Sequence, residues 1–204
     1  MRYTESHKQE PHQRVLKAAA RALRAKGPDN LAVAEVMKAA GLTHGGFYAH
    51  FESKEALLAE TLDAIFSRAA LQAREMVEGL PPRHALATYV DYYVSALHRD
   101  DPNRGCPMVA LSSDLPRQSK QFREAFNRGV KTLVDGLSRL ISAAGFEEPE
   151  KLAASGLSAM VGAVALSRAV SDKQLSDELL DSARNGIKSR LGLSDVALSH
   201  EKLA

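Results

Sequence analysis

The chain has 204 residues, of which 45% are hydrophobic and 25% charged, as is typical of a soluble globular protein with one substantial core or two small domains. No apolar run approaches the roughly 20 residues needed to cross a bilayer, and the first residues lack the apolar segment of a signal peptide, so we expect a cytoplasmic protein with no membrane partner. The single cysteine excludes an intramolecular disulfide framework.

The net charge of +2 is unevenly distributed along the chain. Residues 1–54 hold nine Lys and Arg against five Asp and Glu, whereas the remaining residues hold eighteen against twenty. An excess of positive charge at one end favours a nucleic-acid partner, although surface Lys and Arg are common in every class of protein.

The first predicted elements are an arm and two helices. Residues 1–11 are polar and end at Pro11, which predicts a flexible N-terminal arm. From His12 to Lys26 apolar residues recur at helical spacing beside a basic outer face. A second short helix around Val36 ends at Gly41, where glycine supplies the left-handed conformation needed for a tight corner.

A third short helix follows the corner, with Thr43 as its N-cap. Phe47 and Phe51 are four residues apart and face one way, which leaves His44 and Tyr48 facing outward. Ser53 is expected to cap a fourth helix that runs from Lys54 to about Glu78. This order of short helix, glycine turn and short helix is characteristic of a helix-turn-helix.

The rest of the chain also predicts helices, over residues 84–99, 108–115, 119–144, 150–170 and 176–191. A loop is expected from Asp100 to Pro107, and a polar tail beyond Gly192. We find no convincing alternating strand and no internal repeat, so the predicted class is all-α with about nine helices.

The segment Thr43-His44-Gly45-Gly46 suits the start of a helix that reads the major groove. Such a helix needs small residues where its backbone approaches DNA, and polar side chains for base edges and phosphates. Two glycines inside a short helix cost about 1 kcal/mol each relative to alanine, so a purely structural role for the pair, as a loop between core helices, is the weaker alternative.

The segment from Ala34 to Glu60 resembles the N-terminal DNA-binding region of the tetracycline-repressor (TetR) family of bacterial regulators. That family's pattern is a helix, Ala-Gly-apolar-Ser/Thr, a reading helix with an aromatic-Tyr-x-x-Phe core, then Ser-Lys-Glu-x-Leu. The matching residues are Ala40, Gly41, Leu42, Thr43, Phe47, Tyr48, Phe51, Ser53, Lys54, Glu55 and Leu58. The match covers roughly residues 12–62, and beyond it the resemblance is one of architecture only.

The resemblance implies four parts of the chain. Residues 1–11 would be the arm, 12–53 a three-helix helix-turn-helix DNA-binding domain, 54–192 a larger helical effector-binding and dimerisation domain, and 193–204 the tail. Ala32 departs from the family pattern, which usually has a Thr or Ser cap there, and Asn30 or Asp29 is the expected replacement.

The resemblance also implies which residues contact double-stranded operator DNA. The phosphate contacts would be Thr43, Tyr48 and Lys54, the base-edge contacts His44, Gly45 and Gly46, and His50 would lie near the DNA backbone. Lys54 begins a helix whose positive dipole end also attracts phosphate. Alternatively, Tyr48 is a core residue, His50 a surface histidine without a contact, and Lys54 simply solvated.

A homodimer is expected because one such module reads only a few base pairs, whereas two modules read an inverted repeat. Residues 150–170 carry a face of small residues that would let another helix approach closely. With the last helix, as the resemblance implies, they would form a four-helix interface between two subunits over residues 150–191. The alternative is that these helices pack only within one subunit.

A repressor also needs a pocket for a small-molecule effector, which we expect in the middle helices. The candidate residues are aromatic and sulfur-containing or apolar, and each is alternatively ordinary core: Phe66, Tyr89, Tyr92, Tyr93, Cys106, Met108, Leu111, Phe122, Phe126 and Met160. A mostly apolar pocket suits a small hydrophobic effector.

Cys106 stands at the junction of a loop and a helix, near Arg104, and both features lower the pKa of a thiol. The Gly-Cys segment is similar to that of a subset of the family that responds to electrophiles or oxidants. A buried, inert cysteine in the pocket wall is an equal alternative.

The expected function is therefore that of a transcriptional repressor released by a hydrophobic or electrophilic effector. An effector-independent DNA-binding protein and an all-α enzyme are the alternatives. No nucleophile elbow or phosphate loop occurs, and His44 and His50 lack the i, i+4 spacing of a helical metal pair, so we expect no catalytic residue, cofactor or metal.

Overall fold

The computed structural model describes residues 6–101, 105–194 and 196, and every regular element in this part of the chain is helical. The α-helices are α1 (Ser6–Lys26), α2 (Val33–Ala39), α3 (Lys54–Val77), α4 (Pro82–Tyr93), α5 (Ala96–Asp100), α6 (Pro107–Leu111), α7 (Lys120–Ala143), α8 (Pro149–Ala169) and α9 (Lys173–Arg190). Two 3-10 helices are η1 (His44–Ala49) and η2 (Leu115–Arg117). The predicted all-α class is confirmed.

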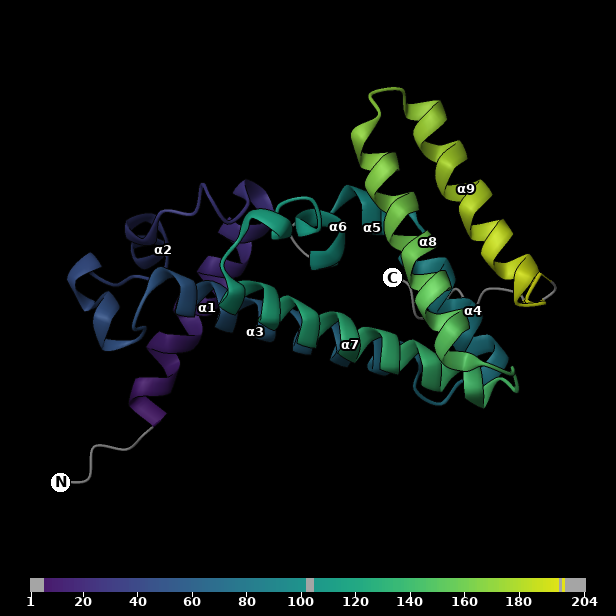
Figure 1. The fold of residues 1–204 in the computed structure, drawn as a ribbon, viewed down its shortest axis with the longest axis horizontal. Helices are drawn as coiled ribbons and strands as arrows, with labels where there is room; N and C mark the ends of the chain where they lie inside the picture. The colour runs from purple at the N-terminus through teal and green to yellow at the C-terminus, as the bar shows by residue number, and fades with distance from the viewer. Residues whose placement is uncertain (1–5, 102–104, 195, 197–204) are drawn as a thin grey trace.

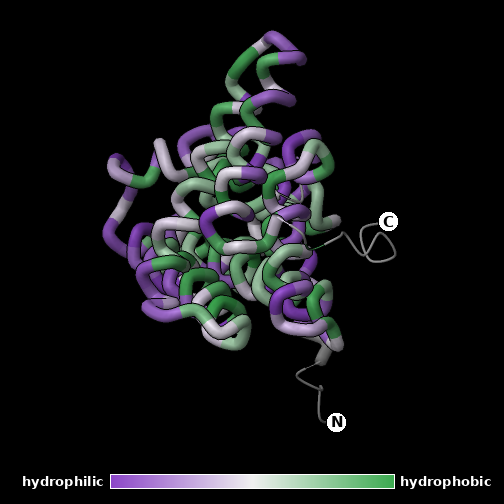
Figure 2. Tube along the Cα trace, turned by 90° about the vertical axis from the view of Figure 1, so that its right-hand side faces the viewer, coloured by the Kyte–Doolittle hydropathy of each residue, from purple (hydrophilic) through white to green (hydrophobic). Residues whose placement is uncertain are grey.

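The helices form a small head and a larger body (Figure 1). The head consists of α1, α2 and η1, and α3 leads from it into the body, where it lies along α7. At the far end α8 and α9 form an antiparallel pair beside α4. Figure 2 shows hydrophobic residues gathered in the middle of this assembly and hydrophilic ones around its edge.

The long helices α3 and α7 are in very close contact at Gly129. A Cβ atom built on Gly129 would lie 2.0 Å from the ring of Phe66. That ring is buried and packs edge-on against Phe126, with 5.5 Å between the ring centroids. The close packing of α3 against α7 therefore requires a residue without a side chain at position 129.

The prediction of a flexible arm over residues 1–11 is wrong for its second half, because α1 already begins at Ser6 and passes through Pro11. Pro11 removes one hydrogen bond, to the carbonyl four positions earlier, and α1 tolerates this loss in its second turn. Residues 1–5 lie outside the described part of the chain.

The helix predicted over residues 84–99 is two helices. The backbone turns at Val94 and Ser95, and the Ser95 hydroxyl caps α5 by accepting a hydrogen bond from the His98 amide at 3.1 Å. The apolar spacing continues across the turn, so periodicity alone did not reveal the break.

Three further boundaries differ from the prediction. The helix expected over residues 108–115 is α6 followed by η2, and the last helix starts earlier, at Lys173, because Asp172 caps it. The start of the tail predicted as polar includes Leu193, which is fully buried. Residues 195 and 197–204 of that tail lie outside the described part.

Contrary to the prediction, α8 is long and apolar enough by length and composition to cross a membrane. Its most apolar window has a mean hydropathy of 1.4, and 33% of that window is buried. One such helix is weak support for a membrane span, because the core helices of soluble proteins reach similar values. Much of its apolar surface is left uncovered within one chain.

Candidate nucleic-acid interface and effector cavity

The surface expected to read DNA is built on η1. The corner before it is closed by Gly41 with a φ of +71°, and Phe47 and Phe51 are buried beneath it, as predicted. His44 is exposed, and the Tyr48 side chain is 76% exposed, so the interpretation of Tyr48 as a core residue is wrong. Thr43, His44, Gly45 and Tyr48 form the surface that we call the reading face.

Gly45 of the reading face and its neighbour Gly46 lie in different surroundings. A Cβ atom on Gly45 would meet no atom within 4 Å, whereas one on Gly46 would lie 3.7 Å from Thr43 Oγ1 and 3.9 Å from Met37 Cε. Gly45 therefore presents bare backbone to the outside, and Gly46 rests on α2.

Two predicted caps are absent and one is present. Thr43 holds the cap position of η1, but its side chain accepts no backbone hydrogen bond and is free to face a partner. Ala32 precedes α2 with no side-chain cap, since Asn30 bonds to the Lys26 carbonyl and Asp29 to Gln118. Ser53 caps α3 by accepting from the Ala56 amide at 3.0 Å.

Lys54 and His50 frame the reading face. Lys54 is the first residue of α3, and its ammonium makes a long contact of 3.5 Å with the Asp29 carbonyl. His50 is half-buried, and its ring centroid lies 6.1 Å from that of His12 in α1. The His12 ring stacks on Phe51 at 4.6 Å and bonds to Glu60 of α3 at 2.5 Å, which fixes α1 against the base of the face.

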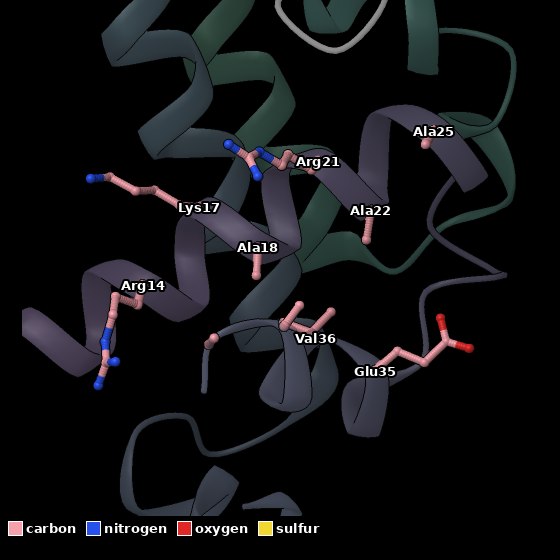
Figure 3. Close-up of a pocket in the computed structure, with 10 residues that line it drawn as sticks. Arg14, Lys17, Ala18, Arg21, Ala22, Ala25, Glu35 and Val36 are labelled. Carbon is pink, nitrogen blue, oxygen red and sulfur yellow. The ribbon is translucent and has the colours of Figure 1, made fainter. Parts of the chain in front are cut away.

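A groove of about 490 Å³ lies between α1 and α2 beside the reading face (Figure 3). Arg14, Lys17 and Arg21 form its basic edge, and small side chains such as Ala18 and Ala22 form its floor. No ion pair involves these three cations within the described residues. Their charge is available to a polyanion.

A separate small cavity in the body brings together four of the ten predicted pocket residues. Tyr89, Tyr92, Tyr93 and Cys106 line a space of about 50 Å³ between α3, α4 and α7. The other six candidates do not line it and pack elsewhere in the body: Phe66, Met108, Leu111, Phe122, Phe126 and Met160. The Tyr93 hydroxyl is buried in the described structure without a hydrogen-bond partner.

His98 also lines this cavity and was not found by sequence reasoning. Its Nδ1 lies 2.7 Å from the Tyr93 carbonyl, and its Nε2 accepts a hydrogen bond from the Cys106 amide at 2.9 Å. A carbonyl only accepts and an amide only donates, so both bonds together require the neutral ring with its proton on Nδ1. A lone histidine within an apolar helix carried no spacing signal that would have identified it.

The expected low pKa of Cys106 is contradicted. Burial raises the pKa of this thiol, and the nearby Tyr93 side chain and the backbone of Met108 and Val109 act in the opposite direction without reversing it. Cys106 is 7% exposed, and desolvation of a thiolate outweighs the effect of a helix start. Arg104, the predicted neighbour, lies outside the described residues.

The cavity wall is tied directly to the head. Arg24 of α1 donates through Nε to the Gly105 carbonyl at 3.1 Å, next to Cys106. From the other side Arg168 of α8 donates to the His98 and Arg99 carbonyls at 2.6 and 2.9 Å. If this wall moves, the hydrogen bonds to Arg24 and Arg168 would therefore transmit the movement to α1 and α8.

The neutral state of His98 leads to a pH prediction. Burial lowers the pKa of His98, as does the nearby Arg168 charge, whereas the Tyr93 carbonyl and Asp101 raise it. The unfolded chain takes up this proton near 6.5 and the folded chain only at lower pH, so folding stability falls as the pH falls below about 6.5.

We expect the melting temperature to drop between about pH 7 and pH 5, and to drop less in His98→Gln, which cannot be protonated. His84→Gln, at an exposed position on α4, is the matched control and should follow the wild type. Equal pH profiles for wild type and His98→Gln would remove His98 from this role.

The exposed reading face on two buried phenylalanines, beside a basic groove, defines a helix-turn-helix protein. Two family models match the chain: "Bacterial regulatory proteins, tetR family" over residues 15–61, and "Transcriptional regulator LmrA/YxaF-like, C-terminal domain" over residues 82–181. The chain belongs to the TetR family of bacterial regulatory proteins, as the resemblance implied, and that family consists of transcriptional regulators.

Individual proteins agree with this assignment. The chain is 38% identical over 79 residues to YdgC of Bacillus subtilis, an uncharacterised HTH-type transcriptional regulator, a match that covers 39% of this chain and 38% of YdgC. The matches cover only 38–59% of the lengths of such curated relatives.

Solved structures share the whole fold at low identity. The reduced form of NemR from E. coli superposes with a TM-score of 0.72 at 20% identity, covering 88% of this chain and 96% of NemR. A TetR-family regulator from Cytophaga hutchinsonii gives a TM-score of 0.75 at 21% identity, covering 93% and 98%.

Proposed function

We propose that this protein is a cytoplasmic transcriptional repressor that binds an inverted-repeat operator as a homodimer and is released by a small molecule. The observation that carries the proposal is the reading face, where His44, Gly45 and Tyr48 are presented outward by a core of Phe47 and Phe51. An apolar core holding polar side chains and bare backbone outward is what reading a major groove requires.

Within this proposal the contacts divide by type. Thr43, Tyr48 and Lys54 hold phosphates, His44 and Gly45 approach base edges, and Gly46 lets η1 sit close on α2. His50 lies at the edge of the face, near the DNA backbone. The basic edge of the α1–α2 groove adds attraction for flanking phosphates, which positions the head without reading sequence.

The homodimer is proposed through α8 and α9, within residues 150–191. Leu166 and Leu175 are 57% and 44% exposed, and Cβ atoms on Gly156, Gly162 and Gly186 would meet nothing within 4 Å. Two such faces brought together would bury apolar surface and allow close helix contact. Figure 2 shows hydrophobic turns on the projecting end of this pair.

The effector is proposed to act at the cavity lined by Tyr89, Tyr92, Tyr93 and Cys106. At about 50 Å³ it is far smaller than the roughly 300–1,000 Å³ of ordinary ligand pockets, so a ligand must displace part of its wall. That wall includes Cys106, whose neighbour Gly105 is bonded to Arg24 of the head. Differential binding to the displaced state would move the heads apart and release DNA.

The test is footprinting on the DNA around the protein's own gene, in low salt, with and without candidate effectors. We expect protection of an inverted repeat, with the two halves about one helical turn apart, and loss of protection when an effector is added. Absence of protection at low salt contradicts a DNA-binding regulator, and protection that no effector removes favours an effector-independent protein.

Electrophile sensing by Cys106 remains part of the proposal. A small activated alkene such as N-ethylmaleimide that enters the cavity would form a bond from the Cys106 sulfur to one alkene carbon, and the thiol proton would pass to the other. The raised pKa of the thiol predicts a slow reaction that speeds up with increasing pH.

We expect Cys106→Ser to bind operator as the wild type does and to stay bound after N-ethylmaleimide treatment. The measurement is operator retention in a gel-shift assay, with mass spectrometry of the modified chain as a check. Since Cys106 is the sole cysteine, unchanged release in the serine variant rejects thiol sensing outright.

A further inference from the structure

A second groove, on the outside of the body, adjoins the effector cavity. It lies between the later turns of α3 and α7 and has a volume of about 490 Å³. Ala73, Tyr89 and Leu133 line both spaces. The groove, unlike the cavity, already has the volume that a small organic ligand occupies in known proteins.

Apolar side chains form the walls of the groove, and no side chain of the described residues fills the space above Gly136 at its floor. Leu71 of α3 is 45% exposed there, and the largely buried side chains of Leu133 and Leu137 of α7 also line the groove. A Cβ atom on Gly136 would meet only Arg139 Nη2, at 3.9 Å, so no side chain fills the space above this glycine. An apolar molecule lying here would cover surface that the chain leaves in water.

Both charged residues that line the groove are arginines, Arg74 from α3 and Arg139 from α7. Among the described residues neither has an ion-pair partner, and Asp135, close by on α7, is already paired with Lys131 at 2.8 Å. The Arg139 guanidinium lies over Gly136, at the groove itself. Within the described residues, therefore, no carboxylate is paired with either arginine of the groove.

We propose that this α3–α7 groove binds an amphipathic organic anion, whose carboxylate is held by Arg74 and Arg139 and whose apolar body lies against Leu133 and Leu137. Guanidinium groups bind carboxylates through two parallel hydrogen bonds, and apolar walls favour the remainder of the molecule. Tyr89 lines both this groove and the effector cavity, so a molecule bound in the groove would contact a wall of that cavity. The identification of this molecule as the effector rests on the proposed function.

The test uses the full chain and decanoate as the probe, measured by isothermal titration calorimetry, with decanol and decylamine as the neutral and cationic analogues. We expect one decanoate per chain, bound at least about tenfold more tightly than either analogue, since each lost charge-assisted contact costs about one order of magnitude. Binding of decanol or decylamine equal to that of decanoate overturns the proposal.

The variants Arg74→Gln and Arg139→Gln are each expected to weaken decanoate binding at least about tenfold, with decanol unaffected. Arg123→Gln, at another exposed arginine of α7 that makes no ion pair among the described residues, is the matched control and should bind decanoate as the wild type does. Gly136→Leu keeps both arginines but fills the groove, and should abolish binding. Decanoate binding that survives Gly136→Leu places the ligand elsewhere and overturns the proposal.

Two further outcomes distinguish a ligand site in this groove from a contact between subunits and from the effector site of the switch. If Gly136→Leu changes the oligomeric state in sedimentation, the groove is a contact between copies of the chain and not a ligand site. If decanoate binds through the arginines but does not reduce operator protection, the groove stands and its assignment as the effector site of the switch fails.

Discussion

Gly129→Ala is expected to destabilise the protein by about 2 kcal/mol, the reverse of the usual effect of this substitution inside a helix. Alanine normally favours a helix by about 1 kcal/mol over glycine. Here the new methyl group would lie 2.0 Å from the buried Phe66 ring, so α3 and α7 must move apart or the ring must leave its contact with Phe126. For a chain of this length the melting temperature should fall by about 4–8 °C.

Gly136→Ala, two turns further along the same helix, is the matched control. Its Cβ meets nothing closer than 3.9 Å, so the ordinary helix preference should raise the melting temperature by about 2–4 °C. Both variants are measured by circular dichroism during heating. If Phe66→Leu relieves the clash, the double variant Gly129→Ala/Phe66→Leu will lose less than the sum of the single losses, and additive losses would show that the clash is not the cause.

The features that the sequence predicted correctly are those that depend on residues close to one another in the chain. Gly41 forms its corner with a positive φ, Ser53 caps α3, and the paired phenylalanines are buried, because each depends on residues within one or two turns. The break at Val94 and Ser95 was missed because the same apolar spacing continues on both sides of it. What stabilises the break is the bond from His98 back to the Tyr93 carbonyl.

The candidate site divides in the same way. The reading face follows from a short motif, whereas the cavity is assembled from α3, α4, α5, α7 and the residue before α6. The position of Cys106 at a helix start predicted a low thiol pKa, with a buried, inert cysteine as the alternative, and burial raises that pKa. Sequence reasoning named neither His98, which the fold brings to the cavity, nor Arg74 and Arg139, which only the pairing of α3 with α7 places in one groove.

Lys54→Gln and His44→Ala are expected to weaken operator binding in two distinguishable ways. Loss of the Lys54 charge should reduce the affinity for every DNA sequence, and should lower the slope of log affinity against log salt by about one, since about one counterion fewer is released. Loss of the His44 ring should cost about 1–3 kcal/mol at one base pair of each half-site and leave the salt slope unchanged.

Both changes lie at the surface of the head, so neither should move the melting temperature by more than about 1 °C, which excludes unfolding as the cause of lost binding. Fluorescence anisotropy over a salt series, on the operator and on single-base-pair variants of it, measures both effects. A second control is Lys120→Gln, an exposed lysine at the start of α7, which should leave affinity and slope intact. Should His44→Ala weaken binding equally on all sequences, the histidine holds a phosphate, and base reading falls to the bare backbone at Gly45 and to the hydroxyls of Thr43 and Tyr48.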